Sequence, residues 1–250
     1  MPDNVEPPRP VVVTGAAGSI GSLIAARLGT RWQIRATDVR CGAETEALDV
    51  TAMDRCLAAF EGADAVVHLA GNPNPEAEWD ALRGPNVEGA YVVAAATREC
   101  GVRRLVLASS LQAVSGYPQT RQRRADDPPR AANLYGATKA WAEAIGSWVA
   151  ATSRTSVVTL RIGYFSEQPP AGEEATPRNL SAWLSPDDCT RLIQVAVETE
   201  QTGLTAINGI SANRYRGAEL GAAEHSIGYE PNDDAWGQIV SGPAHIRDAP

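Results

Sequence analysis

Tyr135 and Lys139 are four residues apart in the segment 134–150, whose apolar pattern predicts an amphipathic helix. Residues at this spacing lie on one face of a helix, so the phenol and the ammonium are expected to be neighbours. A free tyrosine has a pKa near ~10, and a nearby ammonium favours the phenolate. Ser110 ends an expected strand 25 residues upstream of Tyr135, where it could hydrogen-bond a substrate oxygen while Tyr135 moves the proton. The three residues predict proton transfer between an alcohol and a ketone.

A second pattern, Gly15-x-x-Gly18-x-x-Gly21, directly follows the apolar run 11–13 and opens an expected helix. In such a turn the first glycine permits the tight bend, the second lets the main chain approach a pyrophosphate, and the third allows close helix–strand packing. The helix start, at Ser19 and Ile20, offers amide groups and a positive dipole end to phosphates. The pattern predicts a dinucleotide site.

Asp38 follows Gly21 by 17 residues and ends the second expected strand. A carboxylate at that place accepts hydrogen bonds from the adenosine ribose hydroxyls, and it repels the 2′-phosphate of NADP. Asp38 therefore predicts NAD as the cofactor. Arg40 is close enough to weaken this preference, so NADP stays possible.

Two further segments are expected in the same crevice. In Leu48-Asp49-Val50, Asp49 could lie near the adenine with Val50 against it, or Asp49 could instead cap a helix. Leu69, Ala70 and Gly71 end another strand with small residues where a dinucleotide would cross the sheet. His68, just before them, is interpreted either as a strand-end histidine satisfied by a hydrogen bond or as a catalytic group.

The elements that must position these residues alternate between strand and helix over the first ~165 residues, which predicts βαβ units and a parallel sheet. Expected strands include 11–13, 33–38, 63–70, 104–110 and 156–160. After Gly163 the alternation ends in a Pro/Glu-rich loop, 166–180, followed by a helix with Ser185 as N-cap and Pro186 at its first position. We expect one domain over 1–250, with about 164–250 forming a small substrate-side cap.

Composition excludes several classes of protein. The chain has 250 residues, and 22 Lys+Arg against 30 Asp+Glu give a formal net charge of −8, which argues against nucleic-acid or anionic-membrane binding. No window approaches the ~20 apolar residues of a membrane span, and the N-terminus lacks the apolar core of a secretory signal. The four cysteines are far apart and form no CxxC pair, so neither a metal site nor a disulfide framework is expected. We expect a cytoplasmic protein whose partners are a small-molecule substrate and further copies of itself.

The densest charge run is 121–130, RQRRADDPPR. Because two acidic residues lie inside it, we interpret it as a solvated loop rather than a phosphate clamp.

These motifs resemble those of the short-chain dehydrogenases/reductases, in their NAD-dependent epimerase/dehydratase branch. Three further stretches stand in the order seen in that family: HLAG, Asn86-Val87-Glu88-Gly89 and Ala108-Ser109-Ser110. The resemblance covers essentially the whole chain. It implies a Rossmann-type doubly wound α/β fold, an NAD cofactor, and Ser110, Tyr135 and Lys139 as the catalytic set. Asn86 would take the place of the family's helix asparagine, with a structural or proton-relay role.

Within that branch, the stretches GYPQT, LYGATKAWAE, LRIG and RNLSAWLSPDD look most like uronate dehydrogenases. By this resemblance Arg178 matches the arginine that grips the substrate carboxylate. The residues that meet sugar hydroxyls differ, however: Leu111 and Gln112 replace Asn-His, while Asn72 and Tyr164 stand where serines are expected. Because a site with buried polar groups rejects substrates that leave them unpaired, these changes favour a different, less hydroxylated and neutral ring.

The expected function is an NAD(P)-dependent oxidoreductase. It would interconvert a secondary alcohol and a ketone, or a lactol and a lactone, on a small polar cyclic metabolite such as a nucleoside-like or modified-sugar compound. Three alternatives stay open: uronate oxidation, sugar epimerisation or dehydration with the cofactor recycled in place, and a non-enzymatic NAD(P) sensor.

Overall fold

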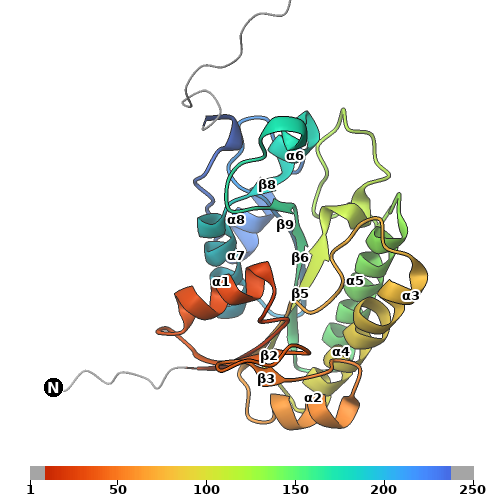
Figure 1. Ribbon diagram of the computed structural model, residues 1–250, viewed down its shortest axis with the longest axis vertical. Helices are drawn as coiled ribbons and strands as arrows, with labels where there is room; N and C mark the ends of the chain where they lie inside the picture. Colours follow the sequence, from red (N-terminus) through yellow and green to blue (C-terminus); the bar gives the residue numbers. More distant parts are fainter. Residues whose placement is uncertain (1–8, 238–250) are drawn as a thin grey trace, which may run out of the picture.

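A parallel sheet of seven strands forms the centre of the computed structural model, which describes residues 9–237 (Figure 1). Its order is β3-β2-β1-β4-β5-β6-β9. The strands are β1 (Pro10–Thr14), β2 (Gln33–Asp38), β3 (Glu46–Ala47), β4 (Ala65–His68), β5 (Arg104–Ser110), β6 (Ser156–Ile162) and β9 (Leu204–Gly209). The strand order runs outward in opposite directions from β1 and from β4, so the topological switch point lies between these two strands. In such sheets, ligands bind in the crevice at the carboxyl ends of the strands near the switch point.

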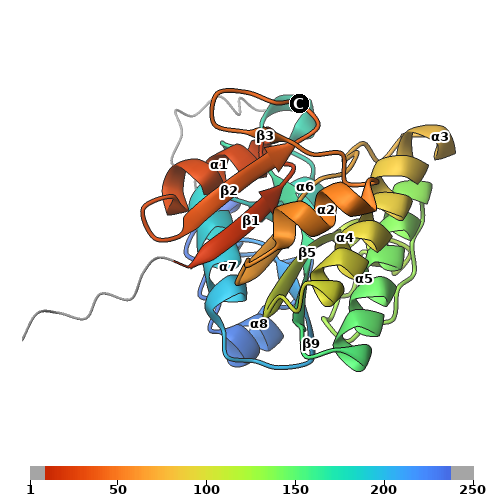
Figure 2. The same cartoon turned by 90° about the horizontal axis from the view of Figure 1, so that it is seen from below.

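Helices cover both faces of the sheet (Figures 1 and 2). On one face lie α1 (Ser19–Leu28), α7 (Pro186–Glu198) and α8 (Gly221–Ile227), which share one apolar core with the sheet. On the other lie α2 (Met53–Phe60), α4 (Gly89–Glu99) and α5 (Leu134–Thr152), which form a second core. Strands buried on both faces explain the continuous apolar runs of β1 and β4. The predicted Rossmann-type doubly wound fold is confirmed.

Local signals set where the two longest helices begin. The Asn133 side chain accepts a hydrogen bond from the Gly136 amide at 2.7 Å, so α5 starts immediately before Tyr135. Ser185 caps α7 through the Asp188 amide, with Pro186 at the first helical position, as predicted.

The helix expected over 86–100 begins differently. A short helix α3 (Trp79–Leu82) leads into a π-helical turn, η1 (Arg83–Glu88), and regular α-helix starts only at Gly89. Such turns occur frequently at functional sites, and this one contains Asn86. Short 3₁₀ turns occupy η2 (Leu111–Val114) and η3 (Gly172–Glu174).

The part of the chain after Gly163 lies in two places, and its role as a substrate-side cap stays a prediction. Strand β9 extends the main sheet and α7 packs on one of its faces, whereas β7 (Tyr164–Phe165), α6 (Pro177–Ala182) and β8 (Trp183–Leu184) form a small unit beside its carboxyl edge. Strand β9 escaped prediction because it is an edge strand with only its last three residues buried, so it lacks an apolar run. Residues 238–250 of the expected cap lie outside the described residues. Within residues 9–237, no helix has the length and apolarity needed to cross a bilayer.

Candidate active site

A cleft of about 750 Å³ opens at the carboxyl ends of the central strands. The glycine turn after β1 forms one side, and the start of α5 with the residues after β5 and β6 forms the other. Its walls include Gly15, Gly18, Ser19, Ile20, Gly21, Arg40, Leu69, Gly71, Ser110, Gln112, Tyr135, Lys139 and Tyr164. The fold therefore brings the glycine motif and the Tyr–Lys pair, more than 100 residues apart in sequence, into one cavity.

The glycine turn has the close packing that its sequence motif predicts. Gly15 has a φ of +73°, and a Cβ there would lie 2.5 Å from the Ala70 nitrogen. A Cβ on Gly21 would lie 2.2 Å from the Gly15 oxygen, so both positions need glycine for close packing. Gly18 instead faces open space apart from the Gly15 oxygen at 3.2 Å. Helix α1 has neither a side-chain cap nor an acidic residue in its first turn, so its amide groups suit an anion.

Asp38 lies beside this turn but is engaged within the protein. One carboxylate oxygen accepts from the Ala17 amide at 3.1 Å, and the other accepts from the Arg40 amide and guanidinium at 2.9 and 3.4 Å. The Asp38 side chain is 7% exposed, whereas that of Arg40 is 68% exposed and borders the cleft. A carboxylate and an exposed guanidinium thus lie side by side next to the glycine turn, and their roles toward the ribose stay predictions.

Tyr135, Lys139 and Ser110 converge in the cleft. The Lys139 ammonium donates to the Ala108 carbonyl at 2.9 Å and lies 5.6 Å from the centre of the Tyr135 ring. Ser110 Oγ accepts from the Gln112 amide at 3.2 Å, at the end of β5. Lys139 and Ser110 therefore both lie beside Tyr135.

Burial shifts the pKa values of all three titratable groups near this point. Burial raises the pKa of Tyr135, whereas the hydrogen bond with Ser110 acts in the opposite direction and lowers it. Burial lowers the pKa of Lys139 from 10.5 to about 8, so the ammonium form still dominates at neutral pH and can favour the phenolate. His68, buried behind Lys139, has its pKa lowered to about 3 by burial and by the charge of Lys139.

His68 and Asn86 support the site from behind. The His68 Nδ1 lies 2.8 Å from Thr14 Oγ1, which agrees with the strand-end interpretation of this histidine. Buried Asn86 accepts from the Asn72 amide at 2.7 Å and donates to Thr138 Oγ1 at 3.2 Å. Because Thr138 precedes Lys139, Asn86 links the segment after β4 to the catalytic helix.

Some predicted cofactor and substrate residues lie away from the cleft walls. Asp49 is exposed and accepts from the Thr51 amide and hydroxyl at 2.9 and 2.7 Å. Val50 is buried against Gly89 in the core. Ala70 packs against Gly15, and Asn72 accepts from the Asn74 amide at 3.0 Å. Their roles stay predictions.

A smaller hollow of about 90 Å³ adjoins the cleft and shares Ser110, Gln112, Ile162, Gly163 and Tyr164 with it. Leu111 and Arg178, both expected at the substrate, line this hollow. Arg178 donates to the Gln112 side-chain oxygen at 3.3 Å, and the Tyr164 hydroxyl donates to Glu174 at 2.8 Å. Four of the five residues compared with the uronate pattern, Leu111, Gln112, Tyr164 and Arg178, therefore line one hollow next to Ser110, whereas Asn72 does not.

Two features of this region escaped sequence reasoning. Arg123, inside the run interpreted as a solvated loop, is 7% exposed and lines the hollow. Glu143, two turns after Tyr135, is paired with buried Arg161 at 2.8 Å and accepts from the Ser109 hydroxyl at 2.6 Å. The spacing of Glu143 from Tyr135 was a signal for a shared helix face, but the partner on β6 could be found only in the fold.

Comparison with known proteins agrees with this geometry. The model of the NAD dependent epimerase/dehydratase family matches residues 11–184. An L-arabinose 1-dehydrogenase (NAD(P)(+)) from Haloferax volcanii is 35% identical over 90% of this chain and 97% of its own length. An NAD-dependent glucose-6-phosphate dehydrogenase from the same organism is 31% identical over 91% and 94%.

Among solved structures, a uronate dehydrogenase from Agrobacterium tumefaciens complexed with NAD is 27% identical, with a TM-score of 0.84 over 97% of this chain and 92% of that chain. These matches confirm the predicted class, an NAD(P)-dependent dehydrogenase acting on a CH–OH group, and the predicted cofactor. By sequence and by fold, the chain belongs to the NAD-dependent epimerase/dehydratase family.

Proposed function

We propose that this protein oxidises a cyclic sugar at its anomeric carbon, converting the lactol into a lactone while NAD is reduced. The observation that carries the proposal is the convergence of Ser110, Tyr135 and Lys139 in the cleft that the glycine turn borders. The three relatives described above are named for a sugar, a sugar phosphate and a sugar acid, and one name specifies carbon 1. They favour a sugar over the nucleoside-like compound that the sequence left open.

The residues divide the reaction between them. Ser110 donates its hydroxyl hydrogen to the substrate oxygen and so fixes that oxygen beside Tyr135. Tyr135, as phenolate, takes the hydroxyl proton while the C–O bond becomes a carbonyl. Lys139, charged at neutral pH, stabilises the phenolate. The bound nicotinamide supplies the hydride acceptor, so the products are lactone, NADH and a proton.

The test is net NADH formation by the purified full-length chain with NAD and arabinose, glucose, glucose 6-phosphate or glucuronate. We expect turnover of at least one of these sugars. Tyr135→Phe should lower kcat by roughly 10²–10⁴-fold, because general acid–base catalysis contributes about that much, while NAD still binds. Tyr91→Phe, on the exposed side of α4, is the matched control and should retain wild-type kcat.

The alternatives give different results in the same experiment. Interconversion of sugars without net NADH would indicate an epimerase. Tight NAD binding with no conversion of any sugar would favour a sensor. Retention of more than about a tenth of kcat in Tyr135→Phe would contradict the assigned role of the phenol.

A further inference from the structure

Arg123 differs from the other arginines of its charged segment. Arg121 and Arg124 are 41% and 63% exposed and are paired with Asp127 and Asp126, respectively. Arg123 is 7% exposed and makes no ion pair within residues 9–237. Its Nη1 donates to the Gly217 carbonyl at 3.2 Å, whereas its buried Nε has no hydrogen-bond partner. Burying a guanidinium without a counter-charge is costly, so the structure holds this group in an unfavourable position.

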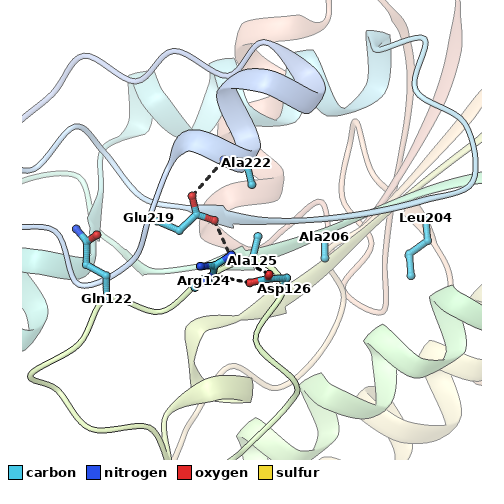
Figure 3. Close-up of a pocket in the computed structure, with 8 residues that line it drawn as sticks. All are labelled: Gln122, Arg124, Ala125, Asp126, Leu204, Ala206, Glu219 and Ala222. Atoms are coloured by element: carbon cyan, nitrogen blue, oxygen red, sulfur yellow. Dashed lines mark hydrogen bonds and ion pairs between the residues drawn. The ribbon is translucent and has the colours of Figure 1, made fainter.

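The main chain around Arg123 explains how that position is maintained. The Arg123 amide donates to the Gly217 carbonyl at 3.1 Å, and its carbonyl accepts from the Glu219 amide at 2.9 Å. Glu219 also accepts from the Ala125 and Ala222 amides at 3.0 and 3.1 Å, which ties the loop to the start of α8 (Figure 3). Arg124 and Asp126 lie together on this side of the loop, whereas Arg123 lines the hollow next to Ser110.

Arg104 shows what a buried arginine with a purely structural role looks like here. It also lacks a carboxylate partner in residues 9–237, and its Nε, like that of Arg123, has no hydrogen-bond partner. Its guanidinium nevertheless donates to the Thr199 and Gln201 carbonyls at 2.6 and 2.7 Å, just after α7. Arg123 has one weaker carbonyl contact and faces a cavity. The adjoining cavity and the fewer carbonyl contacts therefore distinguish Arg123 from Arg104, and they indicate that the Arg123 guanidinium is available to a ligand.

A second guanidinium borders the same hollow. Arg178 enters from α6, and the hollow's lining contains no carboxylate. Burial and the charge of Arg178 both lower the pKa of Arg123, because two guanidiniums that border one hollow repel each other. An anion bound between the two guanidiniums would instead attract both and favour their charged forms. At about 90 Å³ the hollow is much smaller than the ~300–1,000 Å³ of typical ligand pockets, so it suits a substituent of the substrate.

We propose that Arg123 is a specificity-determining residue which, together with Arg178, binds a phosphomonoester on the sugar substrate. One arginine is sufficient for a carboxylate, which its planar fork contacts through two hydrogen bonds. Two guanidiniums in a hollow whose lining contains no carboxylate match the charge of about −1.5 to −2 on a phosphate. The proposal rests on the proposed sugar oxidation, because the hollow adjoins Ser110. It replaces the neutral ring favoured by the sequence.

The kinetic test uses three sugars that share a ring: glucose, glucuronate and glucose 6-phosphate. In the wild type, kcat/KM for glucose 6-phosphate should exceed that for glucose and for glucuronate by about 10- to 100-fold, because hydrogen bonds to charged groups contribute that much. Arg123→Gln should lower the ratio of kcat/KM for glucose 6-phosphate over glucose by a similar factor, and Arg123→Lys should restore it only in part. Arg124→Gln, the neighbouring control, should leave the ratio unchanged.

A binding measurement separates failure of this proposal from failure of the proposed oxidation. With NAD present, glucose 6-phosphate should raise the melting temperature of the wild type and of Arg124→Gln, but not that of Arg123→Gln, and glucose should have little effect on any of them. That result without NADH formation would overturn the proposed reaction and keep the anion subsite. Equal responses of Arg123→Gln and Arg124→Gln would overturn the subsite, as would a wild type that oxidises glucose or glucuronate as efficiently as glucose 6-phosphate.

Discussion

Replacing Lys139 by methionine should stabilise the protein at neutral pH in the absence of NAD, although it removes a residue of the proposed catalytic set. Burial lowers the pKa of Lys139 from 10.5 to about 8, so keeping the ammonium charged in the folded state costs about 3 kcal/mol. Methionine avoids this cost but loses the hydrogen bond to the Ala108 carbonyl, worth about 1 kcal/mol. The free energy of unfolding should therefore rise by about 2 kcal/mol at pH 7.

The pH dependence gives this prediction a second, sharper form. Between pH 8 and 10.5 the unfolded chain binds a proton on this lysine that the folded chain does not, so wild-type stability rises with pH across that window. Lys139→Met has no such contribution. Its advantage should shrink from pH 8 upwards and change sign near about pH 10, where only the lost hydrogen bond remains.

Urea unfolding of both proteins at a series of pH values measures this difference, and contributions of the tyrosines and cysteines that titrate alike in both cancel. The wild type also allows a direct check, because Lys139 is the only lysine in the 250-residue chain. Carbon-13-labelled lysine should give a single side-chain signal that titrates near pH 8. A midpoint near the ordinary value, or a stability difference that is flat between pH 8 and 10.5, would refute the reasoning.

Three further predictions concern the surroundings of the site. The His68→Asn variant should lose about 2 kcal/mol less stability than the wild type when the pH falls from 7 to 5. The pKa of His68 is lowered to about 3, so over this range only the unfolded wild-type chain takes up a proton on the imidazole. Equal losses in the two proteins, measured by urea unfolding, would contradict this. Asp38→Ala should reduce the preference of kcat/KM for NAD over NADP at least about tenfold, and Arg40→Ala should increase it; unchanged ratios in both variants would show that neither side chain meets the ribose. Arg161→Met should lower the free energy of unfolding by about 3–5 kcal/mol, because it leaves buried Glu143 unpaired. Adding Glu143→Leu to Arg161→Met should recover most of that loss. A double variant no more stable than Arg161→Met would disprove this account of the pair.

Short-range patterns determined most of the fold and the cofactor half of the site. The apolar runs of β1 and β4, the glycine turn and the capped helix α5 each depend on neighbours within a few residues, because turn geometry, helical periodicity and capping are local properties. The four-residue spacing of Tyr135 and Lys139 is likewise a property of one helix. These features could therefore be read from residue types and intervals alone.

The substrate half depended on contacts between distant segments. Arg123 has the same residue type and neighbourhood as Arg124, and only the pairing of its main chain with Gly217 and Glu219 turns one guanidinium inward and the other outward. Strand β9 at the sheet edge has no continuous apolar run, and its place is set by pairing with β6. Sequence specified what each segment can form by itself; tertiary structure decided which charges are buried together, because burial results from packing between segments and not from the order of residues within one.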